Sequence, residues 1–213
     1  MCFSKELSIT SFLFGMIGSI ILLLFGKNTY KSSNMVIGIM FIFVSFMQLI
    51  EYMIWSDMEC KKGLNKFASY IGPLFNHLQP LLLFILTSCI MKSLNIIPTH
   101  ILLVANAAYL IYLLAKYEDH MKTNVNLCIG TNETGHLKWT WGDKFNYLFY
   151  IIILLLNMVN YYNDKNFMIA SGLIFISLLT SITKFNKNVG EIWCLMVTGI
   201  PYINMLIQYT GLI

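Results

Sequence analysis

Arginine is absent from the 213 residues, and charged side chains of every kind make up only 11% of them. A soluble domain carries about 25% charged residues, because water must wet its surface. All the basic side chains are lysine, so the chain lacks the guanidinium groups that commonly bind phosphates and guanine edges. The low charge argues against a water-soluble globule, and the missing arginine argues against a nucleic-acid partner.

Several catalytic and cofactor motifs are also missing. The five cysteines include no CxxC pair, which excludes a zinc ribbon or a thioredoxin site. No P-loop, dinucleotide-binding or HExxH motif occurs. Residues 192–212 contain no lysine, so a retinal Schiff base in the last apolar segment is excluded. Ser171-Gly172 lacks the preceding Gly-x of a rhomboid nucleophile, and without arginine there is no Asp-Arg-Tyr motif of a G-protein-coupled receptor.

Apolar residues are abundant instead, at 57% of the chain with a mean hydropathy of +0.68. About 20 apolar residues in a helix cross roughly 30 Å of hydrocarbon. The apolar runs therefore predict an all-α integral membrane protein in a lipid bilayer, with a single transmembrane domain over residues 1–213. About seven spans are predicted, at residues 8–26, 34–55, 67–91, 94–115, 145–162, 167–183 and 192–212.

The orientation of the predicted bundle stays open. Seven spans place the termini on opposite sides, and the N-terminal side, here called side X, also holds the long loop 116–144 and the connection 56–66. Ten of the fourteen lysines fall on side X, which favours a cytoplasmic side X by the positive-inside rule. Two features favour a lumenal side X. Asn132 begins an Asn-Glu-Thr glycosylation sequon, and Cys60 and Cys128 share that side and are candidates for a disulfide.

Polar side chains within the predicted spans are the candidate functional residues. Burying an ionisable group in lipid is costly, so such groups usually face the bundle interior and mark a site. Glu51 lies about 6 Å and His77 about 15 Å from side X at helical rise. Both would line a vestibule that opens to side X, or they would simply pair and fix the helix register. The candidates for a substrate or ion pathway are Glu51, Asn76, His77, Gln79 and Asn204.

A metal ion is the one cofactor that the residue types indicate. Imidazole and carboxylate ligands suit zinc, iron or copper. Glu51 and His77, joined by Cys2 or His136 from side X, form the candidate ligand set. The alternative for Cys2 is an ordinary thiol near the terminus.

A short internal sequence repeat favours a transport function. Pro73 and Asn76 in the third span repeat the Pro-x-x-Asn spacing of Pro201 and Asn204 in the seventh. These two spans would be equivalent members of a 3+1+3 arrangement. Kinked helices at equivalent repeat positions are typical of transporters.

The opening Met1-Cys2-Phe3-Ser4 resembles the Met-Cys-Trp-Ser start of an uncharacterised family of small multi-pass membrane proteins, with fungal, bacterial and large-DNA-virus members. Further similarities are Asp57 and Cys60 after the acidic end of span 2, Gln79-Pro80 in span 3, and His136-Leu137-Lys138-Trp139 in the long loop. Phe3 replaces the family's usual tryptophan. The resemblance implies a multi-pass architecture and supplies no activity.

Three functions remain in competition at this stage. A small transporter or channel would use the polar residues as a pathway. A non-catalytic structural or assembly protein would use them to hold helices together. A metal-dependent membrane enzyme would act on a lipid or a small apolar substrate, with its ligands gathered around one ion. Enzymatic activity, substrate and oligomeric state are not specified by these residues.

Overall fold

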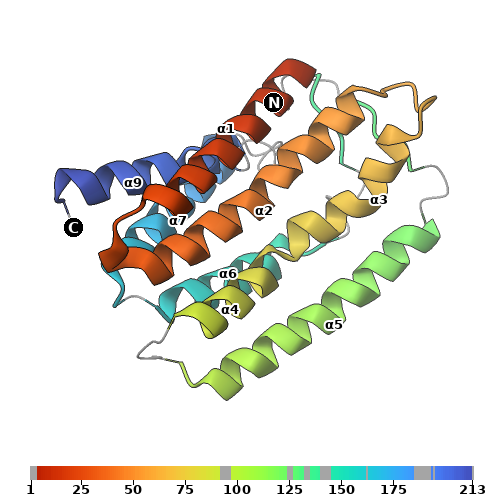
Figure 1. Ribbon diagram of the computed structural model, residues 1–213. Coiled ribbons are helices and arrows are strands. Elements are labelled where there is room, and N and C mark those ends of the chain that lie inside the picture. Colours follow the sequence, from red (N-terminus) through yellow and green to blue (C-terminus); the bar gives the residue numbers. More distant parts are fainter. Residues whose placement is uncertain are drawn as a thin grey trace.

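The computed structural model describes residues 4–91, 97–123, 127–131, 135–139, 145–161, 163–184, 193 and 195–212. These residues are helical apart from turns, loops and one isolated β-bridge between Thr131 and Leu137. The all-α fold class predicted from the apolar runs is confirmed. Figure 1 shows the helices side by side in a bundle. They are α1 (Lys5–Phe25), α2 (Lys31–Trp55), α3 (Leu64–His77), α4 (Gln79–Ile90), α5 (Thr99–Thr123), α6 (Tyr147–Val159), α7 (Lys165–Lys184) and α9 (Ile200–Thr210).

Helix α2 lies at the centre of the bundle and packs against α1, α3, α4, α7 and α9. Small residues bring α1 and α2 close together, because a Cβ atom on Gly15 would collide with the Ser45 hydroxyl. Such small residues let helices pack tightly where there is little hydrophobic driving force between them. The side chains of Val36, Met47 and Ile54 on α2 are fully buried.

The predicted span 67–91 is not one straight helix, because α3 and α4 meet at Leu78 with a bend of 47°. Pro80 has no backbone N–H, so it cannot donate to the Asn76 carbonyl four residues earlier, and its ring crowds the preceding turn. The hydroxyl of Tyr109 donates to the His77 carbonyl at 3.1 Å, which gives the broken backbone an internal partner. His77 and Gln79 consequently flank the break.

Four or five helical segments among the described residues are long and apolar enough to span a membrane, and the predicted count of seven spans is not confirmed. Four helices are long and apolar enough to cross a membrane, namely α1, α2 with the 3-10 turn Asn28–Tyr30 before it, α5 and α7. The bent pair α3–α4 supplies a fifth crossing if it counts as one span. Helices α6 and α9, with 13 and 11 residues, reach only about 20 and 17 Å.

Two predicted boundaries also shift. Helix α5 begins at Thr99 and continues to Thr123, whereas the sequence predicted a span over 94–115 followed by the loop 116–144. The extra turns carry Lys116, Glu118 and Lys122, and the Lys122 ammonium donates to Glu118 one turn away at 2.5 Å. Such pairs stabilise an exposed helix end, so apolar periodicity alone underestimated its length.

An amide network joins α2, α7 and α9 at the end of the bundle opposite side X. Asn34, Asn166, Asn204 and Gln208 are at most 3% exposed. The Gln208 Nε2 group donates to the Oδ1 atoms of Asn34 at 2.7 Å and of Asn166 and Asn204 at 2.9 Å. Its Oε1 atom accepts from the Lys27 backbone N–H at 3.0 Å, which ties the α1–α2 connection to the same network. The amide groups therefore satisfy one another and hold three helices in register.

Replacing Gln208 by Leu should lower the free energy of unfolding by about 1–2 kcal/mol, because the buried oxygen atoms of the network lose their shared donor. Thermal unfolding of the purified protein in detergent measures this change. The matched control is Thr210→Leu, at an exposed position of α9 whose hydroxyl bonds only the Ile207 carbonyl of its own helix. Equal melting temperatures for Gln208→Leu and the control would show that the network contributes nothing to stability.

Candidate functional site

A small cavity lies between α2, α4, α6 and α7 and opens partly to the surroundings. Four helices and the residues just before α9 contribute to it. Its lining is apolar except for three side chains. The lining residues are Val36, Ile37, Met40, Phe41, Val44, Gln79, Leu83, Leu154, Met158, Phe167, Ala170, Ser171, Ile174, Trp193 and Val197.

The three polar lining residues are Gln79, Ser171 and Trp193. The Gln79 Nε2, Ser171 Oγ and Trp193 Nε1 atoms are buried and have no hydrogen-bond partner among the described residues. Gln79 is 0% and Trp193 5% exposed. Buried polar groups are normally satisfied, and an unsatisfied one costs about 1–3 kcal/mol. Three such groups around one cavity therefore mark the strongest candidate site in the described part of the chain.

The orientation of the Gln79 amide is determined by a neighbour. The hydroxyl of Tyr150 donates to Gln79 Oε1 at 2.8 Å, so the oxygen of the amide is engaged and its NH₂ group is the free end. Tyr150 comes from α6, where it is 3% exposed.

An aromatic cluster around His77 adjoins the cavity through Tyr150. The His77 ring stacks on Phe145 with a centroid separation of 4.4 Å, and Tyr150 approaches it edge-on at 5.6 Å. Tyr150 also contacts the Trp193 ring edge-on at 6.0 Å. His77 Nε2 has no hydrogen-bond partner in the described structure, while the Tyr109 hydroxyl lies 3.4 Å from Nδ1.

Glu51 and His77 do not pair. The contacts of His77 are with Tyr109 and the rings of Phe145, Tyr147 and Tyr150. Glu51 is 1% exposed on α2, where it continues the stripe of cavity-lining positions 37, 41 and 44 at three- and four-residue spacing. It lies seven residues beyond Val44, about 10 Å toward side X.

The other predicted site residues separate in space. Asn204 belongs to the amide network at the opposite end of the bundle, so it cannot share a vestibule with Glu51. Asn76 is buried at 3% exposure next to the helix break. Cys2 and Asn132 lie outside the described residues, so neither the metal role of Cys2 nor glycosylation of Asn132 is tested. Among the residues that are described, no three His, Cys, Asp or Glu side chains gather as a metal-ligand set.

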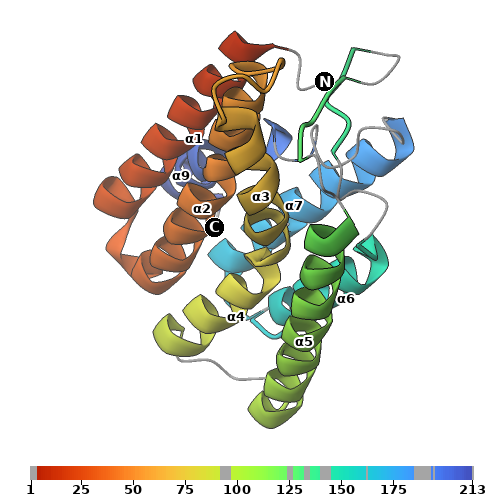
Figure 2. The ribbon, with the colours of Figure 1, turned by 90° about the vertical axis from the view of Figure 1, so that its right-hand side faces the viewer.

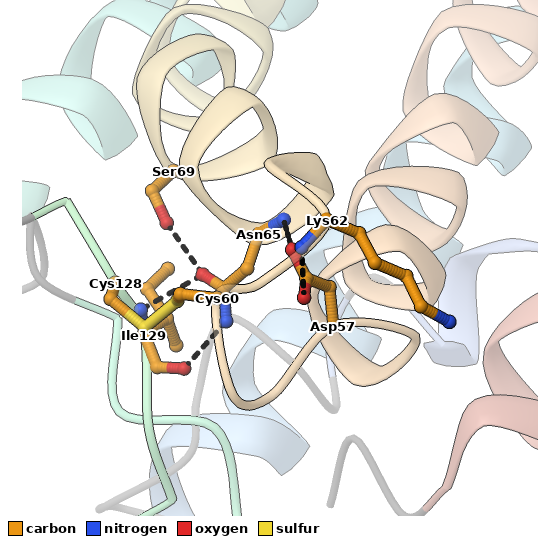
Figure 3. The surroundings of a disulfide bond; sticks show 7 residues. All are labelled: Asp57, Cys60, Lys62, Asn65, Ser69, Cys128 and Ile129. Carbon is orange, nitrogen blue, oxygen red and sulfur yellow. Dashed lines mark hydrogen bonds between the residues drawn. A yellow bond between two sulfur atoms is a disulfide. The ribbon is translucent and has the colours of Figure 1, made fainter.

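A short segment covers the side-X end of α3. We call residues 127–131 and 135–139 the cap segment. Cys128 in this segment forms a disulfide with Cys60, with Cα atoms 6.2 Å apart. The Asn65 side chain makes two further bonds (Figure 3): its Oδ1 accepts from the Ile129 N–H at 2.9 Å and its Nδ2 donates to the Ile129 carbonyl at 2.8 Å. Ile129 and Leu137 are buried, so the cap segment is anchored to the bundle.

Asp57 organises the turn that carries Cys60. Its carboxylate accepts from the backbone N–H groups of Lys62 at 2.9 Å and Asn65 at 3.3 Å, which satisfies donors at the start of α3. Burial raises the pKa of Asp57, but these N–H bonds outweigh burial and hold the pKa below its ordinary value. The ionised form therefore supports the turn that positions both Cys60 and Asn65.

Sequence reasoning identified Gln79 but missed Ser171, Trp193 and Tyr150. Ser171 lies within an apolar run, where a lone serine usually bonds the preceding turn. A usable signal was present on α7, because Phe167, Ala170, Ser171 and Ile174 recur at helical spacing and share one face. The sequence alone does not show which helix packs against that face of α7.

The pH dependence of stability should reveal the role of Asp57. A depressed folded-state pKa stabilises the fold above the unfolded-state pKa, and this stabilisation is lost as the pH falls through the folded-state value. The melting temperature should therefore fall between pH 5 and pH 3. In Asp57→Asn, which retains a side chain suited to helix capping, the fall should be smaller. Glu6 and Glu118 also have lowered pKa values, so the difference between the two proteins is the informative quantity; identical pH profiles would contradict this role.

The comparisons with known proteins identify no relative. Neither a protein-family model, nor a curated protein, nor a solved structure matches the chain. The function of the protein must therefore be inferred from the cavity, its donors and the surrounding helices.

Proposed function

We propose that the chain is a multi-pass integral membrane protein that binds a small, largely apolar molecule inside its helical bundle, as a small transporter does. The observation that carries this proposal is the cavity between α2, α4, α6 and α7. It is apolar except for three donors that have no partner within the described part of the chain. Ligand sites commonly combine an apolar lining with a few polar groups that fix orientation.

Membrane residence is supported by the outward faces of the helices. Leu24 on α1, Ile111 on α5 and Ile176 on α7 are between 60% and 70% exposed. A surface with many such side chains is suited to lipid rather than to water. We retain about seven crossings as part of the proposal, with α6 and the segment that contains α9 as the two additional ones, and the lipid bilayer as the surroundings.

Two features distinguish this function from the alternatives. A purely structural or assembly role predicts polar groups that satisfy one another, as in the amide network, whereas the cavity donors have no partners among the residues that the structure describes. A metal-dependent enzyme predicts converging ligands, but His77 is surrounded by aromatic rings rather than by carboxylate or thiol groups. The break between α3 and α4 beside the cavity favours transport, because discontinuous helices frequently form transporter binding sites.

Filling the cavity should abolish binding. Ala170 is 2% exposed and lines the cavity on α7, so Ala170→Leu adds three carbon atoms to the space that a ligand would occupy. Small molecules that remain bound to the purified protein can be extracted and identified by mass spectrometry. We expect a species that is enriched at least about tenfold in the wild type over Ala170→Leu, which corresponds to about 1.4 kcal/mol.

The matched control is Ala108→Leu, the same substitution at an exposed position of α5. It should retain the wild-type content of bound molecules. Melting temperatures of both variants verify that they fold, since overpacking costs about 1–3 kcal/mol. If both variants retain the same molecules as the wild type, the cavity is not a binding site.

A further inference from the structure

The polar groups of the cavity indicate the chemistry of its ligand. Gln79 offers an NH₂ group, Ser171 a hydroxyl and Trp193 an indole N–H, and all three lack a partner among the described residues. An NH₂ group and an indole N–H can only donate, and the Gln79 oxygen already accepts from Tyr150. The site therefore has an excess of donors, and the group that complements it is a hydrogen-bond acceptor.

The charge of the lining restricts the acceptor further. None of the residues that line the cavity is lysine, histidine, aspartate or glutamate. A carboxylate or phosphate buried there would lack a countercharge, and burying an unpaired charge is very costly. An ammonium group would find neither a carboxylate nor a free acceptor other than the serine hydroxyl. A neutral carbonyl or ether oxygen is the acceptor that needs no countercharge.

The rest of the lining suits an alkyl or isoprenoid body. Val36, Leu83 and Leu154 present only hydrocarbon, and Met40 and Met158 border the same space. Methionine side chains are flexible and adapt to ligands of different shapes. Rotation of these two side chains is the local change that would enlarge the space for a bound hydrocarbon.

We propose that the cavity binds a neutral lipid-like molecule through a carbonyl or ether oxygen that accepts hydrogen bonds from Gln79, Ser171 and Trp193. This inference rests on the proposed function and specifies its ligand class. The Gln79 amide is the central donor because the Tyr150 hydroxyl fixes its orientation.

Two matched photoreactive probes test the ligand class. One is an eleven-carbon methyl ketone with a terminal diazirine, and the other is the hydrocarbon of the same length with the same diazirine. Both are incorporated at equal mole fractions into nanodiscs that contain the full-length protein, and labelled peptides are quantified by mass spectrometry. We expect the ketone to label cavity-lining residues at about fivefold lower concentration than the hydrocarbon, as one additional hydrogen bond would give.

Gln79→Leu should reduce ketone labelling about fivefold and leave hydrocarbon labelling unchanged. Gln48→Leu is the matched control, because Gln48 is a buried glutamine with an unpartnered Nε2 that does not line the cavity. Equal labelling by the two probes, unaffected by Gln79→Leu, would overturn the acceptor while leaving the binding function intact. Labelling of the cavity by neither probe would overturn the proposed function itself.

The disulfide carries a second and independent inference about membrane orientation. Cys60 and Cys128 belong to the connections at side X, and their Cα separation of 6.2 Å lies within the normal disulfide range. The two bonds between Asn65 and Ile129 bring the same segments together without the sulfur atoms. The two thiols would therefore remain adjacent in any reduced form, and an oxidising compartment would join them.

We propose that side X faces an oxidising compartment, which means the lumenal or extracytoplasmic side of the membrane. Cytosolic thiols are kept reduced, so a structural disulfide indicates an oxidising side. The lysine excess at side X favours the opposite orientation, but the positive-inside rule is a statistical bias that other topological signals can override. The disulfide that anchors the buried cap segment is part of the structure itself, so it constrains the orientation directly.

Sealed vesicles with a known cytoplasmic-side-out orientation test this assignment. A membrane-impermeant reductant followed by a polymer-linked maleimide should not tag Cys60 or Cys128 until detergent opens the vesicles. The double variant Cys60→Ser/Cys128→Ser identifies the tags that come from the other cysteines. Tagging of the pair in intact vesicles, with or without the reductant, would overturn the orientation.

Discussion

A polar group buried among apolar side chains must find its hydrogen-bond partner inside the bundle, because neither lipid nor a packed core supplies one. The serine and threonine side chains of the central helices meet this requirement locally. Ser45 donates to the Phe41 carbonyl and Thr87 to the Leu83 carbonyl, both at 2.7 Å and both one turn back. Asparagine and glutamine carry both donors and an acceptor, so they also bond between helices.

Amide pairing between helices consequently determines much of the arrangement. Asn106 on α5 and Asn157 on α6 exchange two hydrogen bonds, at 3.0 and 3.1 Å, and Asn157 also donates to the Pro80 carbonyl at 2.9 Å. This links α5 and α6 to the start of α4, directly after the break. Figure 2 shows α4, α5 and α6 together at one side of the bundle. The backbone carbonyls on either side of the break between α3 and α4 are thus bonded by side chains of the neighbouring helices α5 and α6.

The helical class could be predicted from composition, because this class depends on the totals of charged and apolar residues. No detail of packing alters those totals. Proline positions were less informative: Pro73 is accommodated inside α3, whereas Pro80 accompanies a break. At the break the Tyr109 hydroxyl bonds the His77 carbonyl, and this partner comes from a distant helix that the local sequence does not reveal. The single polar pathway expected from Glu51, His77 and Asn204 divided for a similar reason. Depth along a helix can be read from residue spacing, but the direction of a side chain around the bundle axis depends on which helices become neighbours.

The two ends of the bundle are tied by polar and covalent bonds, and the cavity lies between them. At one end the amide network joins α2, α7 and α9, and at the other the disulfide and Asn65 attach the cap segment. Access along the bundle axis would require breaking one of these sets. The lining residues that are only half-buried are Ser171 and Ile174, both on α7, whereas the others are buried. The lining is therefore closest to the outer surface of the bundle along α7. A neutral, lipid-like molecule could reach the donors from that side without disturbing either end, and a charged molecule arriving from water could not.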